Sequence, residues 1–330
     1  MIDKIGREIE YLRLSITDRC NLRCQYCMSE RNMNFLPREE LLTFEEIKRV
    51  VKIFSKIGIK KIRLTGGEPL VRRNFSDILE NISSVEGIEE INLTTNGLLL
   101  GENFESLLKN KVKKINISLD TLNPVLYNEI TRGGSLDKVL KNIFKSIELG
   151  IERVKINIVL IKGKNDNEIM DFVKFSETYP IDIRFIELMP IGEGKNFTPI
   201  SNDEVIKIIQ KERELFPVNE KIGSGPAKYF KSGFSKGNIG FIAPLSHNFC
   251  DKCNRIRLTS QGMIKPCLCY GKSYNLKEIL RDSGEKIGTE DMKRMLKQRL
   301  ETAILEKPEQ HCFEHLDDIT EKKDMIQIGG

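Results

Sequence analysis

Three cysteines near the start of the chain are the residues whose type and spacing most clearly allow chemistry. Cys20, Cys24 and Cys27 follow a short apolar segment with the spacing C-x3-C-x2-C, and no fourth cysteine lies nearby. Cysteine thiolates normally hold each iron of a cubane iron–sulfur cluster. Three thiolates leave one iron with an open coordination position, and catalytic metal sites keep such a position for their reacting ligand. The spacing therefore predicts an iron–sulfur cluster that binds a further ligand.

A second group of three cysteines lies in the last third of the chain. Cys250 and Cys253 have the spacing C-x2-C. Cys267 follows after a segment that is typical of a β-hairpin, with its turn at residues 260–262. The hairpin would bring Cys267 back to the first two cysteines, as ligation of one metal group requires. This pattern predicts a second three-thiolate site.

Two arginines accompany the second group. Arg255 and Arg257 alternate along a predicted strand, so both side chains point to the same face. Two guanidinium groups beside a metal with an open position form a pocket for an anion, because an arginine fork matches the oxygens of a phosphate. The alternative is a solvated strand face that binds nothing.

Structural zinc is the alternative to iron and sulfide at both groups. Zinc sites usually pair two C-x2-C clusters or add histidines, and none of the three histidines lies near the first group. At the second group, Cys269 could complete a four-thiolate zinc ribbon. If it does not, Cys269 is a single leftover thiol that we expect to be a small buried hydrophobic residue.

Composition limits the class of protein. The 330 residues, 39% hydrophobic and 31% charged, suit about two globular domains. A net charge of +5 is compatible with an anionic ligand, but no long basic run supports nucleic-acid binding. No apolar run approaches the ~20 residues of a membrane span, and no leader pattern opens the chain. We therefore expect a cytoplasmic protein without a membrane partner, in which clustered cysteines indicate metal or catalysis rather than disulfides.

Strand-like runs alternate with helical patterns over residues 11–190. Thr43 and Glu46 form a capping box before one amphipathic stripe, and a second stripe over residues 136–147 ends at Gly150. A run of strand–helix units predicts a parallel sheet with right-handed crossovers. The expected strands are Leu12–Thr17, Lys61–Thr65, Glu90–Thr95, Lys114–Leu119, Val154–Leu160 and Asp182–Leu188.

Six strand–helix units are too few to close an eight-stranded barrel. We therefore predict an α/β fold that consists of a partial, open TIM-like (βα)6 barrel with a wide lateral mouth; a flat doubly wound sheet is the alternative. Composition shifts after Pro190, and Ser201 with Glu204 caps a further helix. The predicted domains are residues 1–190, the barrel core, and residues 191–330, a smaller C-terminal domain that carries the second cysteine group and covers the barrel mouth.

Polar and flexible residues follow four of the predicted strands. In parallel α/β folds, active sites lie at the C-terminal ends of the strands. Ordinary turns also use Gly, Pro, Asn and Asp, and Asn96–Gly97 alone is better explained as a turn. The Gly66–Gly67 loop lies downstream of a three-cysteine motif. It is better explained as a place where the backbone approaches a ligand closely. The four segments are 66–69, 94–97, 118–120 and 187–190.

With these motifs, the chain resembles the GTP 3′,8-cyclase family. The members of this family are radical S-adenosylmethionine enzymes of molybdenum cofactor biosynthesis. The resemblance runs from about Leu12 to the C-terminal Gly329 and Gly330. The first cysteine motif alone would indicate only the radical S-adenosylmethionine superfamily, whereas the second is more specific. The segments that carry the resemblance are 12–20, 24–28, 63–69, 184–190 and 250–259, together with the later Pro-Cys-Leu at 266–268.

The resemblance implies two [4Fe–4S] clusters and S-adenosylmethionine as cofactors. Cys20, Cys24 and Cys27 would hold the first cluster, which binds S-adenosylmethionine. The second cluster would face the guanine of GTP. Its ligands would be Cys250, Cys253 and Cys267, and the residues lining the S-adenosylmethionine site would be Tyr26, Gly67, Ser118 and Met189.

The same resemblance implies the residues that contact GTP. The catalytic residues would include Arg13, Arg255 and Arg257, with Gly329 and Gly330 reaching into the site. Lys155 opens its predicted strand rather than ending it, so its placement depends on the resemblance alone. The basic side chains can converge only if the hairpin domain covers the barrel mouth. The full set for GTP is Arg13, Lys61, Arg63, Thr94, Lys155, Arg184, Arg255, Ile256 and Arg257.

The implied activity is the conversion of GTP to (8S)-3′,8-cyclo-7,8-dihydroguanosine 5′-triphosphate by a deoxyadenosyl radical that removes the ribose 3′ hydrogen. The implied partners are GTP, an external one-electron donor and a downstream cyclic pyranopterin monophosphate synthase, with the chain a monomer or a homodimer. Two other hypotheses remain open at this point. One is a radical enzyme that modifies peptides and carries an auxiliary cluster, and the other is a non-catalytic zinc-binding adaptor.

Overall fold

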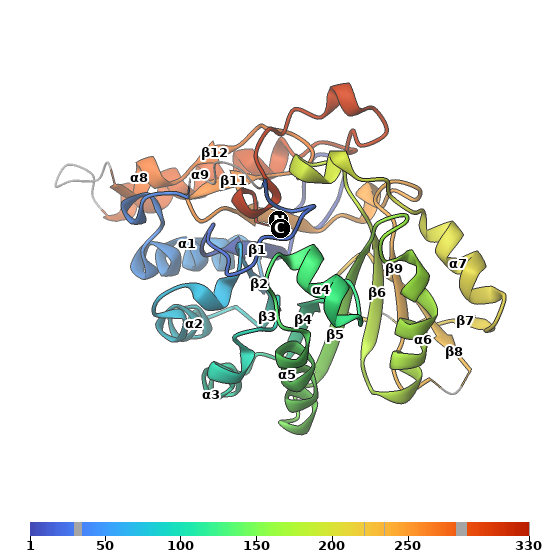
Figure 1. The fold of residues 1–330 in the computed structure, drawn as a ribbon. Coiled ribbons are helices and arrows are strands. Elements are labelled where there is room, and N and C mark those ends of the chain that lie inside the picture. The colour runs from blue at the N-terminus through green and yellow to red at the C-terminus, as the bar shows by residue number, and fades with distance from the viewer. Residues whose placement is uncertain (30–34, 221, 234, 282–288, 330) are drawn as a thin grey trace.

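The structure is a computed structural model that describes residues 1–29, 35–220, 222–233, 235–281 and 289–329. Six parallel strands, adjacent in chain order, form its centre (Figure 1). This arrangement confirms the predicted run of six strand–helix units. The ends of each strand lie within one residue of the prediction, except that β1 ends two residues earlier, at Ser15. The strands are β1 (Tyr11–Ser15), β2 (Lys61–Thr65), β3 (Glu90–Thr95), β4 (Lys114–Ser118), β5 (Arg153–Leu160) and β6 (Asp182–Glu187).

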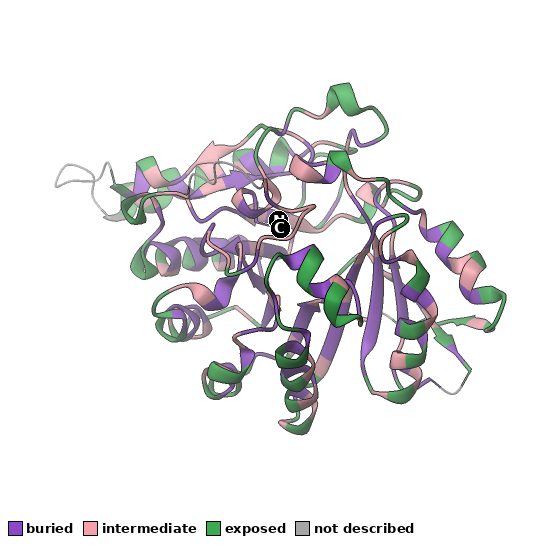
Figure 2. Cartoon of the chain, viewed as in Figure 1, coloured by how far each residue is buried: buried purple, intermediate pink, exposed green. Residues whose placement is uncertain are grey.

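Helices connect these strands and cover one face of the sheet, as right-handed crossovers require. Figure 2 shows the strands mostly buried and the helices buried only along the side that faces them. The residues of that interface form one large hydrophobic core. The helices are α1 (Phe44–Lys56), α2 (Phe75–Ser83), α3 (Phe104–Lys109), α4 (Pro124–Thr131), α5 (Leu136–Glu148) and α6 (Ile169–Thr178).

Capping residues start the helices where the sequence predicts them. The Thr43 side chain accepts a hydrogen bond from the backbone of Glu46, whose carboxylate accepts from the Thr43 backbone, which completes the box at α1. Ser201 and Glu204 form the same box at α7 (Asn202–Gln210). Gly150, just past α5, has a φ of 74°, which is the conformation expected of a glycine after a helix.

The second half of the chain extends the same sheet at both edges. Among the described residues, twelve strands lie in one sheet in which β12 and β7 are the two ends, so the barrel is open as predicted. Strand β10 pairs in parallel with β1, and β9 pairs in parallel with β6. The added strands are β7 (Leu215–Pro217), β8 (Lys228–Ser232), β9 (Ile239–Ile242), β10 (Arg255–Leu258), β11 (Met263–Lys265) and β12 (Tyr274–Asn275).

The hairpin of the second cysteine group is confirmed, and its attachment explains how the arginines meet. Strands β10 and β11 are antiparallel, and Gly262 in their connection has a φ of 84°, which suits glycine. The register places Arg13 of β1 between Arg63 of β2 and Arg257 of β10. The basic side chains therefore converge because the hairpin continues the sheet next to β1.

The C-terminal segments pack beside this edge. Helices α8 (Lys277–Arg281) and α9 (Thr289–Leu305) lie against each other, and α9 also contacts α1. A second, smaller hydrophobic cluster includes Ile191, Phe313 and Ile328, and thereby joins the end of the chain to the segment after β6.

One result corrects the expectation for Cys269. Its side chain is buried, as predicted, but its sulfur is bonded to that of Cys312 at 2.04 Å. Cys269 is therefore not a leftover thiol, and in this state it is not available as the fourth ligand of a zinc ribbon.

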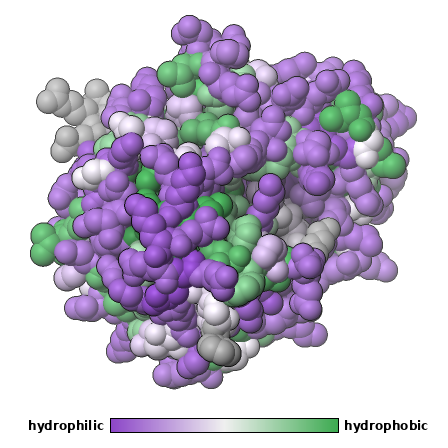
Figure 3. All heavy atoms as spheres, turned by 90° about the vertical axis from the view of Figure 1, so that its right-hand side faces the viewer, coloured by the Kyte–Doolittle hydropathy of each residue, from purple (hydrophilic) through white to green (hydrophobic). Residues whose placement is uncertain are grey.

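The surface gives no sign of a membrane-spanning helix. No helix among the described residues is both long and apolar enough to cross a bilayer. The face in Figure 3 is mostly hydrophilic, with hydrophobic side chains scattered or gathered in small groups.

Candidate active site

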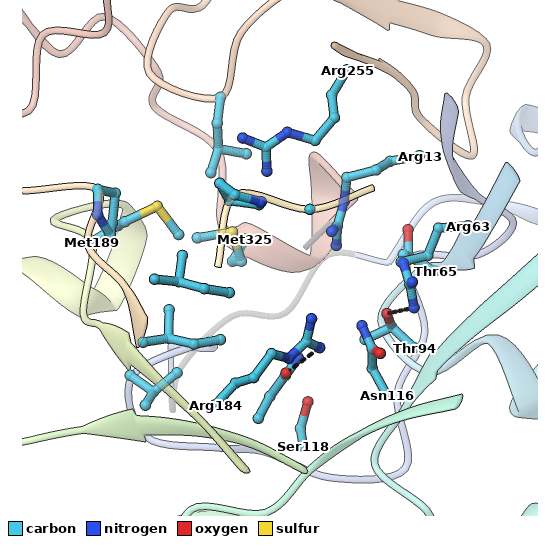
Figure 4. Close-up of a pocket in the computed structure, with 18 of the residues that line it drawn as sticks. Arg13, Arg63, Thr65, Thr94, Asn116, Ser118, Arg184, Met189, Arg255 and Met325 are labelled. Carbon is cyan, nitrogen blue, oxygen red and sulfur yellow. Dashed lines mark hydrogen bonds between the residues drawn. The ribbon is translucent and has the colours of Figure 1, made fainter. Parts of the chain in front are cut away.

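Both cysteine groups line one large cavity. The cavity has a volume of about 380 Å³ and is bounded by strands β1–β6, the β10–β11 hairpin and the C-terminal segment. All six cysteines are free and partly buried. Figure 4 shows the guanidinium groups of Arg13, Arg184 and Arg255 pointing into this space from different elements, with Met189 and Met325 on another side. The arrangement brings two candidate metal sites and a basic wall together.

The first cysteine group sits on a tight turn after β1. The backbone N–H groups of Cys27 and Met28 both donate to the carbonyl oxygen of Cys24, at 3.0 Å each. The sulfur of Cys20 accepts from the Leu22 backbone N–H at 3.4 Å and from the Asn96 side chain at 3.8 Å. These bonds fix the loop, so the three thiols form part of the cavity wall.

The environment of these thiols opposes ionisation. Burial raises the pKa of Cys20 to about 11, with Glu68 contributing, and burial with the nearby Cys20 thiol raises the pKa of Cys27 to about 12. The pKa of Cys24 is also raised, by burial and then by Cys27 and Asp120. Three adjacent buried thiolates need a cation to balance their charge, and a metal supplies it when the thiols release their protons.

Asp120, which lies in the predicted strand-end segment 118–120 but was given no role of its own, ties the first cysteine group to the end of β4. The Tyr26 hydroxyl donates to Asp120 Oδ2 at 2.7 Å, and the Val159 N–H donates to Asp120 Oδ1 at 2.8 Å. Burial raises the pKa of Asp120 to about 6, although both hydrogen bonds favour its charged form. Asp120 is therefore a positioning residue for the tyrosine between the second and third cysteines.

The Gly66–Gly67 loop lies where the sequence places it, at the end of β2, and lines the cavity. Its glycines are required by a neighbouring chain segment: a Cβ on Gly66 would lie 2.6 Å from the Thr17 carbonyl oxygen, and one on Gly67 would lie 2.4 Å from that of Arg19. The loop therefore packs on the segment that leads to Cys20, in addition to any contact with a ligand.

Glu68 locks this loop to the end of β3. Its carboxylate accepts from the Asn96 N–H at 2.6 Å, the Thr95 hydroxyl at 2.8 Å and the Leu70 N–H at 3.0 Å. Burial raises its pKa to about 7. Glu68 thus holds two strand-end loops together beside the first cysteine group.

The second cysteine group differs from the first in having cations beside one of its thiols. Burial alone would raise the pKa of Cys253, but Arg255 and Lys307 outweigh burial and lower it to about 6. Arg255 also lies over the Phe249 ring, with 5.1 Å between the guanidinium carbon and the ring centroid. Cations next to a thiolate stabilise its charged form, so Cys253 favours the thiolate, whereas burial raises the pKa of Cys250.

Arginines from four strands form the basic wall of the cavity: Arg13 of β1, Arg63 of β2, Arg184 of β6, and Arg255 and Arg257 of β10. Burial, together with Arg257, lowers the pKa of Arg13 well below its usual value, and burial with Arg255 lowers that of Arg257 to about 10. Arg63 donates to the Leu93 carbonyl oxygen at 3.1 Å and to the Thr94 hydroxyl at 3.5 Å (Figure 4). Mutual repulsion among buried cations is relieved when a polyanion binds between them.

Lys155 lies near the start of β5, as predicted, yet lines the same cavity. Its amino group hydrogen-bonds the Tyr229 hydroxyl at 2.6 Å and lies 3.4 Å from Asp182. Burial, followed by repulsion from Arg184, lowers its pKa to about 7. The amino group is therefore poised between its charged and neutral forms near neutral pH.

Most of the predicted residues line the cavity. Among the described residues, Lys61, Ile256 and Gly329 do not. Lys61 instead pairs with Glu10 at 3.0 Å. Ile256 is buried in the hydrophobic core on the opposite face of β10 from the two arginines. Gly330 lies outside the described residues. The predicted residues that line the cavity are Arg13, Tyr26, Arg63, Gly67, Thr94, Ser118, Lys155, Arg184, Met189, Arg255 and Arg257, with all six cysteines.

The C-terminal segment reaches the basic wall. Gly329 accepts a hydrogen bond from Arg257 at 3.1 Å and one from the Thr65 hydroxyl at 3.3 Å through its carbonyl oxygen. Its φ is 83°, and a Cβ would lie 3.2 Å from that of Ser15. A larger residue would therefore be strained at this position, which accounts for the glycine.

Sequence reasoning also missed polar residues inside the barrel. Asn92, Asn116 and Asn157 lie on three neighbouring strands and line the cavity. Their inward direction follows from strand alternation, which was the available signal. Lys307, which lies after α9, carried no comparable signal.

Comparison with known families assigns this fold and site to a class. The family model of the Radical SAM superfamily matches residues 14–176, and that of Molybdenum Cofactor Synthesis C matches residues 181–313. The structure of Streptococcus suis SuiB bound to S-adenosylmethionine resembles this one with a TM-score of 0.61 and 17% identity, and covers 97% of this chain and 77% of that one. At this identity the likeness concerns the fold alone. The chain is thus a radical S-adenosylmethionine protein.

Sequence relatives give a narrower assignment. Proteins named GTP 3′,8-cyclase from Clostridium perfringens and Desulforamulus reducens are 47% and 45% identical, and each comparison covers the whole of both chains. A protein of the same name from Petrotoga mobilis is 42% identical over the same full span. The chain belongs to the GTP 3′,8-cyclase family.

The residues present fit the cofactors that the radical S-adenosylmethionine superfamily implies, which are a [4Fe–4S] cluster and S-adenosylmethionine. The first three thiols border the cavity together with Tyr26 and Gly67. Among the described residues, no group of three Cys, His, Asp or Glu side chains converges closely enough to hold a single metal ion. A cubane places each thiolate on a different iron, so it does not need such convergence.

Proposed function

We propose that this protein converts GTP to (8S)-3′,8-cyclo-7,8-dihydroguanosine 5′-triphosphate, the first step of molybdenum cofactor biosynthesis. The observation that carries this proposal is one cavity lined by two three-cysteine groups and a wall of arginines. Full-length relatives at 42–47% identity that are named for this activity support it.

The residues of the first group would hold a [4Fe–4S] cluster that binds S-adenosylmethionine. When bound, these cofactors supply the radical chemistry that removes a hydrogen atom from the substrate. The chain positions them through the Tyr26–Asp120 hydrogen bond and the Glu68 network around Gly67. Ser118 and Met189, which also line the cavity, would contact S-adenosylmethionine.

Cys250, Cys253 and Cys267 would hold a second [4Fe–4S] cluster that faces the guanine base. The lowered pKa of Cys253 favours the thiolate that such a ligand requires. The Arg255 and Arg257 side chains would contact the nucleotide beside this cluster, since both line the cavity.

The triphosphate would lie against the basic wall. Arg13, Arg63 and Arg184 come from three different strands and can contact several phosphate oxygens at once. Lys155 and Thr94 would complete the binding residues. Holding GTP at a fixed distance from the first group is a proximity effect that lowers the barrier to hydrogen transfer.

The remaining partners follow from the reaction. An external one-electron donor would reduce the first cluster, and a cyclic pyranopterin monophosphate synthase would consume the product. The reaction needs no nucleic acid or membrane. We expect a cytoplasmic monomer or homodimer.

The experiment is anaerobic purification and reconstitution, followed by an assay for the cyclised nucleotide. We expect iron and sulfide for two clusters per chain, and product only when GTP and S-adenosylmethionine are both present. Zinc without iron would support an adaptor instead. Cleavage of S-adenosylmethionine that is stimulated by a peptide and not by GTP would support a peptide-modifying enzyme.

A further inference from the structure

A buried lysine lines the cavity together with the second cysteine group. Lys307 is only 8% exposed, and its amino group donates to the carbonyl oxygens of Arg255 at 3.0 Å and of Pro266 at 2.6 Å. Arg255 lies two residues after Cys253, and Pro266 immediately precedes Cys267. One ammonium group therefore bridges the two hairpin strands that carry these cysteines.

A buried arginine connects the remaining cysteine to the same place. Arg7 donates to the Cys250 carbonyl oxygen at 2.8 Å, and also to those of Pro308 at 2.9 Å and Glu309 at 3.1 Å. Its own charge is balanced by Asp3 at 2.6 Å. Arg7 and Lys307 together link all three cysteine-bearing segments to residues 307–309.

The two cations differ in how their charge is compensated. Asp3 neutralises Arg7, whereas the hydrogen-bond acceptors of Lys307 are neutral carbonyl groups. Within the described part of the chain, no carboxylate lies within 4.0 Å of the Lys307 amino group. A buried ammonium without a carboxylate is costly, so an anion nearby is needed to stabilise it.

The charged groups that face Lys307 include two of the cysteines. Burial lowers its pKa, while the thiolates of Cys253 and Cys267 raise it and the cations Arg255 and Arg7 lower it. The charge of an iron–sulfur cluster with three thiolates becomes more negative when it gains an electron. A fixed cation beside these cysteines stabilises that reduced state, since net charge and hydrogen bonding set cluster potentials.

We propose that Lys307 is a positioning residue for the second cluster that also sets its reduction potential: it holds the two hairpin strands together and supplies an uncompensated positive charge beside the cysteines. This inference depends on the proposed second cluster. The first cysteine group has carboxylates, Glu68 and Asp120, where the second has Lys307, so the effect is specific to one cluster.

Three substitutions separate the two roles. Lys307→Gln keeps amide hydrogens for the two carbonyl groups but removes the charge. Lys307→Met removes both, and Lys307→Arg keeps both. Lys272→Met is the matched control, because it makes the same substitution at an exposed lysine. The Lys272 side chain is 61% exposed and pairs with Glu306, the residue immediately before Lys307.

The measurements are iron and sulfide content and a redox titration by electron paramagnetic resonance of the anaerobically reconstituted full chain. The signal of the first cluster is identified by its change when S-adenosylmethionine is added. For Lys307→Gln we expect full iron and a lower potential of the second cluster only. For Lys307→Met we expect the same shift with loss of iron from the second cluster, and for Lys307→Arg and Lys272→Met wild-type behaviour.

An unchanged potential of the second cluster in Lys307→Gln would overturn the electrostatic role, and full iron in Lys307→Met would overturn the positioning role. If Lys307→Met also loses the first cluster, the substitution has disrupted folding as a whole. The potential measured in Lys307→Gln then decides the proposal. Iron for a single cluster in the wild-type chain would instead contradict the proposed function. These outcomes are distinguishable because the wild-type chain is measured first.

Discussion

The two cysteine groups share a ligand pattern but lie in different electrostatic surroundings. Burial raises the pKa values of the first group's thiols, and the nearby carboxylates Glu68 and Asp120 add to this effect. Around the second group, Arg255 and Lys307 reverse the effect of burial on Cys253. The difference teaches that the cysteine spacing defines how many ligands a site offers, whereas the charged side chains around the cysteines define which charge the site stabilises. At the second group, Cys253 is therefore suited to remain a thiolate.

The largest expected effect separates the two groups directly. Cys24→Ala should abolish cleavage of S-adenosylmethionine and therefore all product. Cys253→Ala should abolish product while cleavage of S-adenosylmethionine continues, because the first cluster stays intact. Iron content should fall by about half in each variant, since one of two cubanes is lost. Equal loss of cleavage in both variants would mean that the groups do not have separate roles.

The next effect concerns the basic wall. Arg257→Ala should weaken GTP binding by about 1.5–3 kcal/mol, the range for a hydrogen bond to a charged group, and leave binding of S-adenosylmethionine unchanged. Calorimetry on the reconstituted protein measures both ligands. Lys231→Ala is the control, because this exposed lysine lies on β8 and does not line the cavity. Unaltered GTP affinity in Arg257→Ala would remove this residue from the binding site.

A smaller effect is expected in the pH dependence of binding. With a pKa of about 7, Lys155 loses its proton as the pH rises from 6 to 8, so its attraction for the triphosphate is lost in that window. GTP affinity of the wild-type protein should therefore fall with rising pH. In Lys155→Arg the charge persists, and the fall should be smaller. Identical pH profiles would show that Lys155 does not contact the phosphates.

The positioning of Tyr26 predicts a modest change at the first group only. Tyr26→Phe removes the hydrogen bond to Asp120 and leaves a buried carboxyl with one partner fewer, a cost of about 1–3 kcal/mol. Affinity for S-adenosylmethionine should fall while GTP affinity is retained. A fall in GTP affinity of equal size would show that the two sites are coupled through the loop.

The smallest effect serves as a baseline for the comparison. Thr43→Ala removes the capping side chain of α1, far from either cysteine group in sequence, and should lower the free energy of unfolding by about 1 kcal/mol. Both clusters should keep their iron and their response to ligands. Chemical denaturation and iron analysis of the same sample test this expectation. Loss of either cluster would show that a substitution away from the cysteine groups can also remove a cluster.

The strands, the capped helices and the hairpin could be predicted because each depends on a short pattern. Runs rich in Ile, Leu and Thr located β2 and β3 to the residue. Strand alternation placed Arg255 and Arg257 on one face. The same alternation excludes the side chain of Ile256 from that face, so its inclusion depended on the resemblance alone. Lys61 is the first residue of β2, where it pairs with Glu10 from the segment before β1.

The remaining site residues depend on contacts between distant segments. Lys307 acts on residues 41 and 52 positions away, and Cys312 bonds a cysteine 43 positions away. No local pattern indicates such pairs. Asp120 was at a predicted strand end, but its role requires knowing that Tyr26 lies within hydrogen-bond reach.

The most direct test of the two-cluster account is electron paramagnetic resonance of the reduced, reconstituted protein with each ligand added separately. The account predicts that S-adenosylmethionine alters only the signal of the first cluster and GTP alters only that of the second. In Cys253→Ala the response to GTP should vanish while the response to S-adenosylmethionine persists. A GTP response that survives this substitution would contradict the assignment of the second cysteine group to the nucleotide.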